Sequence, residues 1–226
     1  MVSVYRVVSL FVVFLAFSAC LPPLQTSTVY AQPKINAEVM QPSLALEDKV
    51  LGDPDAPIVL IEYASVTCPA CKRFHDNVLP HLKKKYVDTG KVKLIFRDFP
   101  LSQLSIAISM LARCSSKTDK EFFENLSVLF GAGERVLTSQ FPLDELYEVG
   151  SKRLGLSDAS FKKCMSDRDL LENILSGREV ASKRFGISRV PTFFINGNNV
   201  GYFHSTERLD EVMRRYLGPP KSAKVK

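Results

Sequence analysis

Apolar positions divide the chain into two strand-containing parts with a long helical part between them. Residues 58–63 form a short β-branched run between turn signals, a pattern typical of a central strand buried on both faces. Residues 91–99 alternate apolar and basic positions and predict a second strand. The residues from 69 to about 86 carry one apolar helical stripe, so we expect a helix there with a kink at Pro80.

From residue 101 to about residue 185 the apolar positions have only the helical period. We expect breaks at Gly131-Ala132-Gly133, at Phe141-Pro142 and at Gly155. The breaks leave five predicted helices, at residues 101–116, 119–131, 142–154, 157–166 and 168–185.

Two further strands and a last helix follow this helical part. The strands are predicted at residues 191–195 and 200–203, joined by a turn at 196–199, and the helix at 206–217. The order of elements therefore predicts an α/β sheet with an all-helical insertion.

The N-terminal residues have the pattern of a targeting segment. Residues 1–19 contain one Arg and then an apolar run too short to span a bilayer, as in a signal peptide; a buried N-terminal helix is the alternative. The cleavage site is expected at or before residue 31. Cys20 follows a lipobox-like sequence that would make it a lipid anchor; a soluble mature form is the alternative. Residues 20–45 are rich in Pro and small polar residues and predict a linker.

Composition excludes several classes of protein. The 226 residues are 46% hydrophobic and 24% charged, which is typical of a globular chain and excludes a largely disordered one. The net charge of +6 is scattered, apart from a short lysine run and a basic tail at 219–226, so we expect no nucleic-acid partner. Export would place the cysteines where disulfides persist.

The segment Cys68-Pro69-Ala70-Cys71 lies where a predicted strand ends and a predicted helix begins. Proline is favoured at the first position of a helix, which makes Cys68 the N-cap residue. Unpaired N–H groups and the positive end of the helix dipole would then face its sulfur and lower the pKa of the thiol. A stabilised thiolate makes the corresponding disulfide an oxidant.

Cys114 and Cys164 form the second candidate pair. Chain entropy assigns about 4 kcal/mol to the long loop that this bridge would close and about 2 kcal/mol to the loop of Cys68 and Cys71. We therefore expect a structural disulfide in the helical insertion and a labile one at the helix start; two buried free thiols are the alternative for the insertion. No second closely spaced Cys or His pair accompanies Cys68 and Cys71, so we expect no metal.

Three other residues are candidates for the site. Glu62 interrupts an apolar strand six residues before Cys68, so it lies either on an exposed face or beside the cysteines, where it would handle a proton. His75 is interpreted as a solvated helix residue. Pro191, taken alone, is typical of the start of an edge strand.

Taken together, these motifs resemble the DsbA-type thiol:disulfide oxidoreductases of the thioredoxin superfamily. The resemblance rests on Glu62 and on residues 68–75, 96–100 and 190–197, within about residues 46–217. It implies a thioredoxin fold in two parts, residues 46–100 and 178–218, interrupted by a helical domain at residues 101–177.

The resemblance also assigns roles to individual residues. Cys68 would be the attacked sulfur and Cys71 its buried partner, with Glu62 as the buried acid near them. Pro191 would be cis, and the backbone of Val190 would pair with an extended substrate. Ala70 departs from the family, in which this position is polar or aromatic in the best-known members.

The predicted function is the introduction of disulfides into reduced exported proteins in the periplasm or another extracytoplasmic space. A quinone-linked membrane partner resembling DsbB would reoxidise the dithiol, and neither a nucleotide nor a flavin is implied. A disulfide isomerase or reductase on the same fold is one alternative, although residues 20–43 are too short for the extra N-terminal domain of such enzymes. A peptide-binding chaperone with incidental cysteines is the other.

Overall fold

The computed structural model describes residues 35–41 and 46–218. The chain divides into two compact units, Met1–Gln32 and Pro33–Lys226, and all of the described structure belongs to the second unit. The predicted signal peptide, the candidate lipid anchor Cys20 and the basic tail lie outside the described residues. Within the described part of the chain, no helix is long and apolar enough to cross a membrane.

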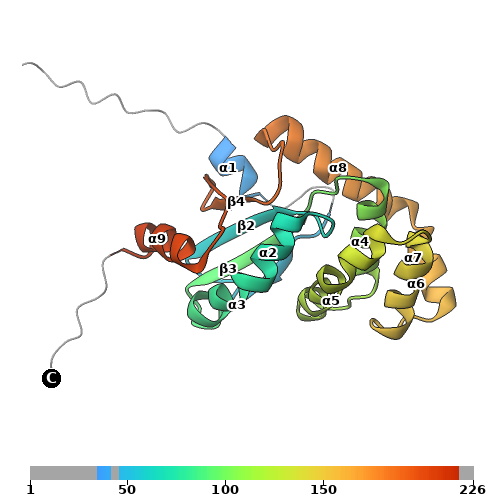
Figure 1. Cartoon of the computed structure of the whole chain (residues 1–226). Helices are drawn as coiled ribbons and strands as arrows, with labels where there is room; N and C mark the ends of the chain where they lie inside the picture. Colours follow the sequence, from blue (N-terminus) through green and yellow to red (C-terminus); the bar gives the residue numbers. More distant parts are fainter. Residues whose placement is uncertain (1–34, 42–45, 219–226) are drawn as a thin grey trace, which may run out of the picture. The chain divides into compact units, whose positions relative to one another are not determined.

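A five-stranded mixed sheet lies at the centre of the described structure (Figure 1). The strand order is β1-β3-β2-β4-β5; β2 and β3 are parallel, and the other neighbours are antiparallel. The strands are β1 (Lys49–Leu51), β2 (Ile58–Ala64), β3 (Val92–Asp98), β4 (Thr192–Ile195) and β5 (Asn198–Gly201). Strand β2 is central and covered on both faces, as its apolar run predicts.

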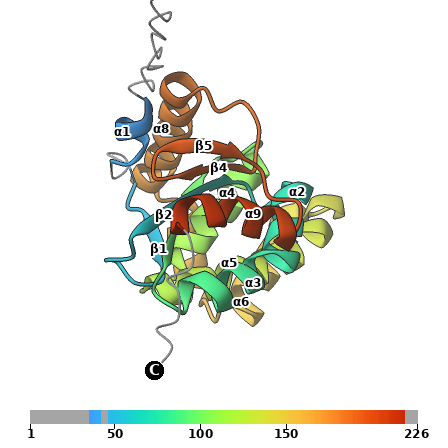
Figure 2. The same cartoon turned by 90° about the vertical axis from the view of Figure 1, so that its left-hand side faces the viewer.

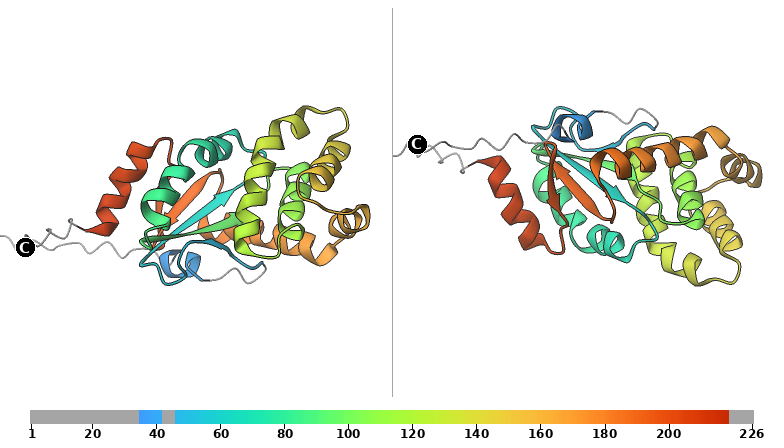
Figure 3. Two further views of the ribbon diagram at one scale, coloured as in Figure 1. Left: turned by 90° about the horizontal axis from the view of Figure 1, so that it is seen from below. Right: turned by 90° about the horizontal axis from the view of Figure 1, so that it is seen from above.

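Helices cover both faces of this sheet, as the turned views in Figures 2 and 3 show. One face carries α1 (Ile35–Val39) and α8 (Arg168–Phe185). The other carries α2 (Pro69–Asn77), α3 (Leu79–Leu82), the π-helical turn η1 (Lys83–Val87) and α9 (Thr206–Leu217). The helices between β3 and α8 are α4 (Gln103–Cys114), α5 (Asp119–Thr138), α6 (Pro142–Lys152) and α7 (Asp158–Met165).

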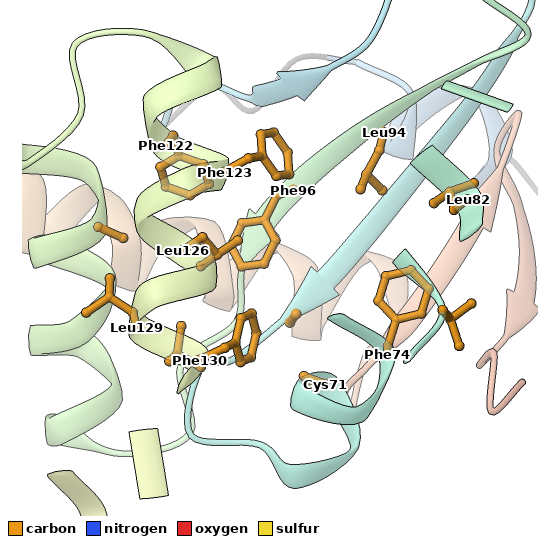
Figure 4. Packing of buried hydrophobic residues seen from close by; sticks show 14 of the residues in the cluster. Cys71, Phe74, Leu82, Leu94, Phe96, Phe122, Phe123, Leu126, Leu129 and Phe130 are labelled. Atoms are coloured by element: carbon orange, nitrogen blue, oxygen red, sulfur yellow. The ribbon is translucent and has the colours of Figure 1, made fainter. Parts of the chain in front are cut away.

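Helix α5 belongs to the inserted helices but packs directly on the sheet beside α2. Figure 4 shows Phe122, Leu126 and Phe130 of this helix pointing toward Phe96 of β3, with Cys71 at the neighbouring start of α2. The rings of Phe96 and Phe122 have centroids 5.6 Å apart. The insertion therefore borders the segment that carries the two candidate cysteines.

The predicted break at Gly131-Ala132-Gly133 is wrong, because α5 continues through these residues to Thr138. A Cβ atom at Gly133 would lie 3.3 Å from the carbonyl oxygen of Val66. Glycine thus lets α5 pass close to the loop before Cys68. Burial of the apolar face of α5 outweighs the low helix propensity of its glycines.

The helix predicted for residues 69–86 is divided into three pieces. Helix α2 ends at Asn77, α3 begins at Leu79 with Pro80 in its first turn, and η1 follows. Proline fits the first turn of a new helix because its missing N–H has no partner there in any case. The predicted kink is therefore a break two residues earlier.

The last hairpin also differs from the prediction. Strand β5 begins at Asn198, and Ile195 pairs with Asn198 across a two-residue turn. The turn residues Asn196 and Gly197 both have positive φ, 47° and 84°. An Asn-Gly pair adopts such a turn readily and joins antiparallel strands directly.

The C-terminal part of the predicted linker contains structure. Helix α1 lies within it, and the side chain of Val39 is fully buried. Buried Arg97 of β3 connects this segment to the sheet: it donates to the carbonyls of Val39 and Gln41 and to both carboxylate oxygens of Asp48. The short β1, which was not predicted, completes the sheet edge nearby.

Asp210 attaches α9 to α3 and η1. It accepts hydrogen bonds from Lys85 and Tyr86, both at 2.6 Å, and pairs with His81 Nε2 at 2.9 Å. Burial alone would raise the pKa of Asp210, but these donors lower it from 3.8 to about 2. The carboxylate is therefore ionised wherever the protein is expected to work.

Candidate active site

Cys68 is the N-cap residue of α2, as the sequence predicts. Its φ and ψ are −90° and 118°, Pro69 follows at the first helical position, and its sulfur accepts a hydrogen bond from the Cys71 N–H at 3.2 Å. The residue retains 6% of its surface exposed, at the edge of the buried core. A sulfur held in this way faces the positive end of the helix.

These contacts lower the pKa of the Cys68 thiol from 9.0 to about 6. Donation from the Cys71 thiol has the largest effect; burial opposes it, and the N–H groups of Cys71 and Ala70 and the charge of Arg73 add to it. Cys68 is therefore largely a thiolate at neutral pH. Ala70 contributes through its backbone, which does not need a polar side chain.

Cys71 has the opposite character. It is fully buried, and burial raises the pKa of its thiol, with further contributions from Cys68 and from the charge of Glu62. The structure holds both cysteines as free thiols. Cys68, which keeps a small exposed area, is thus largely a thiolate, and Cys71 is a fully buried thiol. This is the asymmetry that an exchange reaction with a single attacked sulfur needs.

Glu62 lies in the middle of β2 and has no exposed surface. Both carboxylate oxygens contact Nε2 of His75, at 3.2 and 3.1 Å. The exposed-face alternative for Glu62 is therefore wrong. The interpretation of His75 as a solvated residue is also wrong, because only 9% of this residue is exposed.

A signal in the sequence could have indicated the burial of His75. It follows Cys71 by four residues, and Cys71, Phe74, His75 and Val78 repeat the i, i+3, i+4, i+7 spacing of a buried helix face. A histidine inside that stripe points in the same direction as Cys71. Only the register of α2 on the sheet brings it to Glu62.

The peptide bond between Val190 and Pro191 is cis, and it lies just before β4. The Val190 carbonyl oxygen lies 3.4 Å from the Cys68 sulfur and accepts a hydrogen bond from it when Cys68 is protonated, although 122 residues separate the two in sequence. Folding therefore brings Val190 and Pro191 beside the attacked sulfur. The edge-strand interpretation of Pro191 is wrong, because β4 lies between β2 and β5 in the sheet.

Cys114 and Cys164 are joined by a disulfide with a Cα–Cα distance of 5.8 Å. The bridge connects α4 and α7 and packs against Met110 and Ile174 in a small separate core. Within residues 35–41 and 46–218, no group of three or more His, Cys, Asp or Glu side chains could hold a metal ion.

Comparison with known proteins connects this geometry to a family. Residues 45–215 match the thioredoxin family. The chain belongs to the thioredoxin family. It has a thioredoxin fold with an inserted helical domain, and its relatives and structural neighbours place it among the DsbA-like disulfide oxidoreductases.

Two solved structures illustrate the likeness. Alpha-DsbA1 of Wolbachia pipientis is 30% identical with a TM-score of 0.73, and the match covers 80% of this chain and 94% of that one. BdbD of Bacillus subtilis is 19% identical with a TM-score of 0.66, over 75% of this chain and 92% of that one, which shows the fold alone.

Sequence relatives carry names of the same kind. A Rickettsia bellii protein, provisionally named a protein-disulfide oxidoreductase, is 28% identical over 179 residues, 79% of this chain and 68% of its own length. A Bacillus cereus protein, provisionally named disulfide bond formation protein D, is 29% identical over 73% of this chain and 78% of its own length. Over five Rickettsia relatives, the chain spans 54 to 68% of the relative's length.

Proposed function

We propose that this protein introduces disulfides into reduced exported proteins by exchange at Cys68 and Cys71. The observation that carries the proposal is the difference between the two sulfurs. Cys68, with a pKa of about 6, is a good leaving group, while buried Cys71 favours its protonated form. The reduced enzyme is stabilised by the thiolate, so its disulfide tends to accept electrons.

The reaction has two exchange steps. A thiolate of the client attacks the sulfur of Cys68; a mixed disulfide forms, the Cys68–Cys71 bond breaks, and Cys71 leaves and takes up a proton. The second thiolate of the client then attacks the client sulfur of the mixed disulfide, and Cys68 leaves as a thiolate. The client loses two electrons to the enzyme and becomes the disulfide.

Three neighbouring residues support these steps. Glu62, whose charge acts on Cys71, exchanges the proton with the buried thiol. The backbone of Val190, before cis Pro191, holds the client as an extended strand beside Cys68, consistent with the 3.4 Å contact between the Val190 oxygen and the Cys68 sulfur. Cys114 and Cys164 keep the inserted helices together and take no part in exchange.

The cellular setting is part of the same proposal. Residues 1–19 direct export, the mature protein acts in the periplasm or an equivalent space, and Cys20 is the lipid anchor if cleavage precedes it. A quinone-linked membrane protein resembling DsbB reoxidises the dithiol. The part of the chain that acts on clients consists of the two thioredoxin-like segments, residues 46–100 and 178–218, and the helical insertion at residues 101–177.

A peptide carrying one dithiol tests the function. The oxidised protein is mixed with the reduced peptide, and the peptide disulfide is followed by mass; Cys68→Ser is expected to abolish the reaction. The matched control, Cys114→Ser with Cys164→Ser, removes the other disulfide and is expected to retain the reaction. Oxidation of the peptide by Cys68→Ser at the parent rate contradicts the proposal.

The direction of electron flow needs a second measurement. The Cys68–Cys71 pair is equilibrated in glutathione buffers, and its thiols are trapped and identified peptide by peptide. A potential well above that of thioredoxin, about −270 mV, is expected for an oxidant. A potential at or below that value would favour a reductase or isomerase.

A further inference from the structure

Glu62 and His75 form a buried pair close to the cysteines, and thiol–disulfide exchange by itself does not require such a pair. Glu62 has no exposed surface, and Cys71 has none. A proton that moves between Cys71 and Glu62 therefore stays inside the protein unless another group carries it out. His75 is the side chain in contact with both oxygens of Glu62, through Nε2.

Aromatic rings pack against this pair. The ring of His75 lies 4.2 Å from that of Phe130 in α5, centroid to centroid, and 6.1 Å from that of Phe96 in β3. Glu62 is paired in register with Phe96 of β3 and Phe193 of β4. Among the described residues, Cys71 is the titratable group on which the charge of Glu62 acts, and His75 is the ion-pair partner of Glu62.

His75 differs from Glu62 in reaching the surface. Its side chain retains 5% exposure, whereas that of Glu62 has none. The imidazole thus has Nε2 on the carboxylate, and the His75 side chain keeps a small exposed area. Histidine can take up a proton at one ring nitrogen and release one at the other.

We propose that His75 acts through Glu62 as the proton outlet of the buried Cys71 thiol. When Cys71 leaves the disulfide, its thiolate takes a proton from Glu62, Glu62 takes one from His75 Nε2, and the imidazole takes one from water. The path runs in reverse when Cys71 is reoxidised. His75 is thus a positioning residue, and this role rests on the proposed function.

Reduction of the oxidised protein by glutathione tests the outlet. The chain contains no Trp, so the reaction is stopped with acid at set times and the Cys68 and Cys71 thiols are read by mass. Rates are divided by the fraction of glutathione present as thiolate. His75→Gln keeps an N–H donor for Glu62 but cannot carry a proton.

We expect His75→Gln to slow reduction about tenfold and to change how the corrected rate depends on pH. The alkylation profile of Cys68, which His75 does not contact, stays unchanged. His81→Gln, which removes a half-exposed histidine on Asp210, is the matched control and keeps the parent rate. A parent rate and pH profile in His75→Gln would overturn the proposal.

Glu62→Gln separates a relay from a merely structural role. If His75 acts through Glu62, adding His75→Gln to Glu62→Gln changes the rate no further; the same tenfold loss in both backgrounds overturns the relay. Should His75→Gln not fold, the ring ¹⁵N resonances of His75 are titrated in the oxidised parent and in Glu62→Gln. An identical midpoint in the two proteins also overturns it.

The glutathione experiment can fail without the proposed function failing, and the reverse also holds. Glutathione replaces the client in this experiment, so the outlet is measured even if client proteins are not oxidised. A parent protein that reacts normally with glutathione but leaves the dithiol peptide reduced contradicts the proposed function alone.

Discussion

The low pKa of Cys68 can be divided between its donors by replacing Cys71. A fall from 9.0 to about 6 corresponds to about 4 kcal/mol in favour of the thiolate. Donation from the Cys71 thiol is the largest favourable cause, and a hydrogen bond to a charged group is worth about 1.5–3 kcal/mol. Cys71→Ala is therefore expected to raise the pKa of Cys68 to about 7–8.

Cys71→Ser keeps a donor at the same place and is the matched control. Its hydroxyl can still donate to the Cys68 sulfur, so the pKa of Cys68 is expected to remain near 6. The backbone N–H of residue 71, at 3.2 Å from the sulfur in the parent, is present in both variants. The difference between the variants therefore isolates the side-chain donor.

Thiolate absorbance in the ultraviolet, followed from about pH 4 to pH 10, measures these values. The rate of alkylation of Cys68 against pH is an independent reading, and Cys68→Ser supplies the baseline. A Cys71→Ala protein that titrates like the parent would show that the thiol donor contributes nothing. A Cys71→Ser protein shifted as far as Cys71→Ala would refute the hydrogen bond as the cause.

Three further predictions concern stability. Replacing Cys114 and Cys164 by Ala removes a bridge across 50 positions and is expected to lower the free energy of unfolding by about 4 kcal/mol, measured in urea; a loss below about 1 kcal/mol would contradict this. Arg97→Met removes a buried guanidinium, leaves partly buried Asp48 without its partner and should cost about 1.5–3 kcal/mol in the same assay. An unchanged midpoint would show that the pair is dispensable. Because the pKa of Asp210 is lowered in the folded protein, its carboxylate contributes stability that is complete above about pH 4 and is lost as the pH falls to about 2. Asp210→Asn should therefore be less stable than the parent at pH 5. In acid unfolding experiments the difference in stability should disappear between about pH 4 and pH 2.

Most of the secondary structure could be predicted because it depends on local spacing. Helices α8 and α9 begin and end at the predicted residues, since their caps and apolar stripes are complete within the segments. One error occurs where distant parts of the chain meet. Helix α5 continues through Gly131 and Gly133 because the sheet buries its apolar face, which no local glycine rule includes.

In the candidate active site, too, the local features could be predicted and the contacts between distant segments could not. The N-cap position of Cys68 is a local property of a strand followed by Cys-Pro-Ala-Cys, and the structure has it. His75 was misinterpreted, because its environment comes from Glu62 on β2 and Phe130 on α5. A single helix turn cannot specify which elements will cover it.

The local sequence is therefore enough to show that Cys68, and not Cys71, caps a helix. The helix dipole and its free N–H groups act over a few residues, so the direction of the pKa of Cys68 followed from the motif. Only the tertiary structure decided what faces the buried side of that helix. Packing brings Val190 to Cys68 and buries Glu62 against His75, because contacts between distant segments depend on how apolar faces fit together rather than on neighbours in sequence.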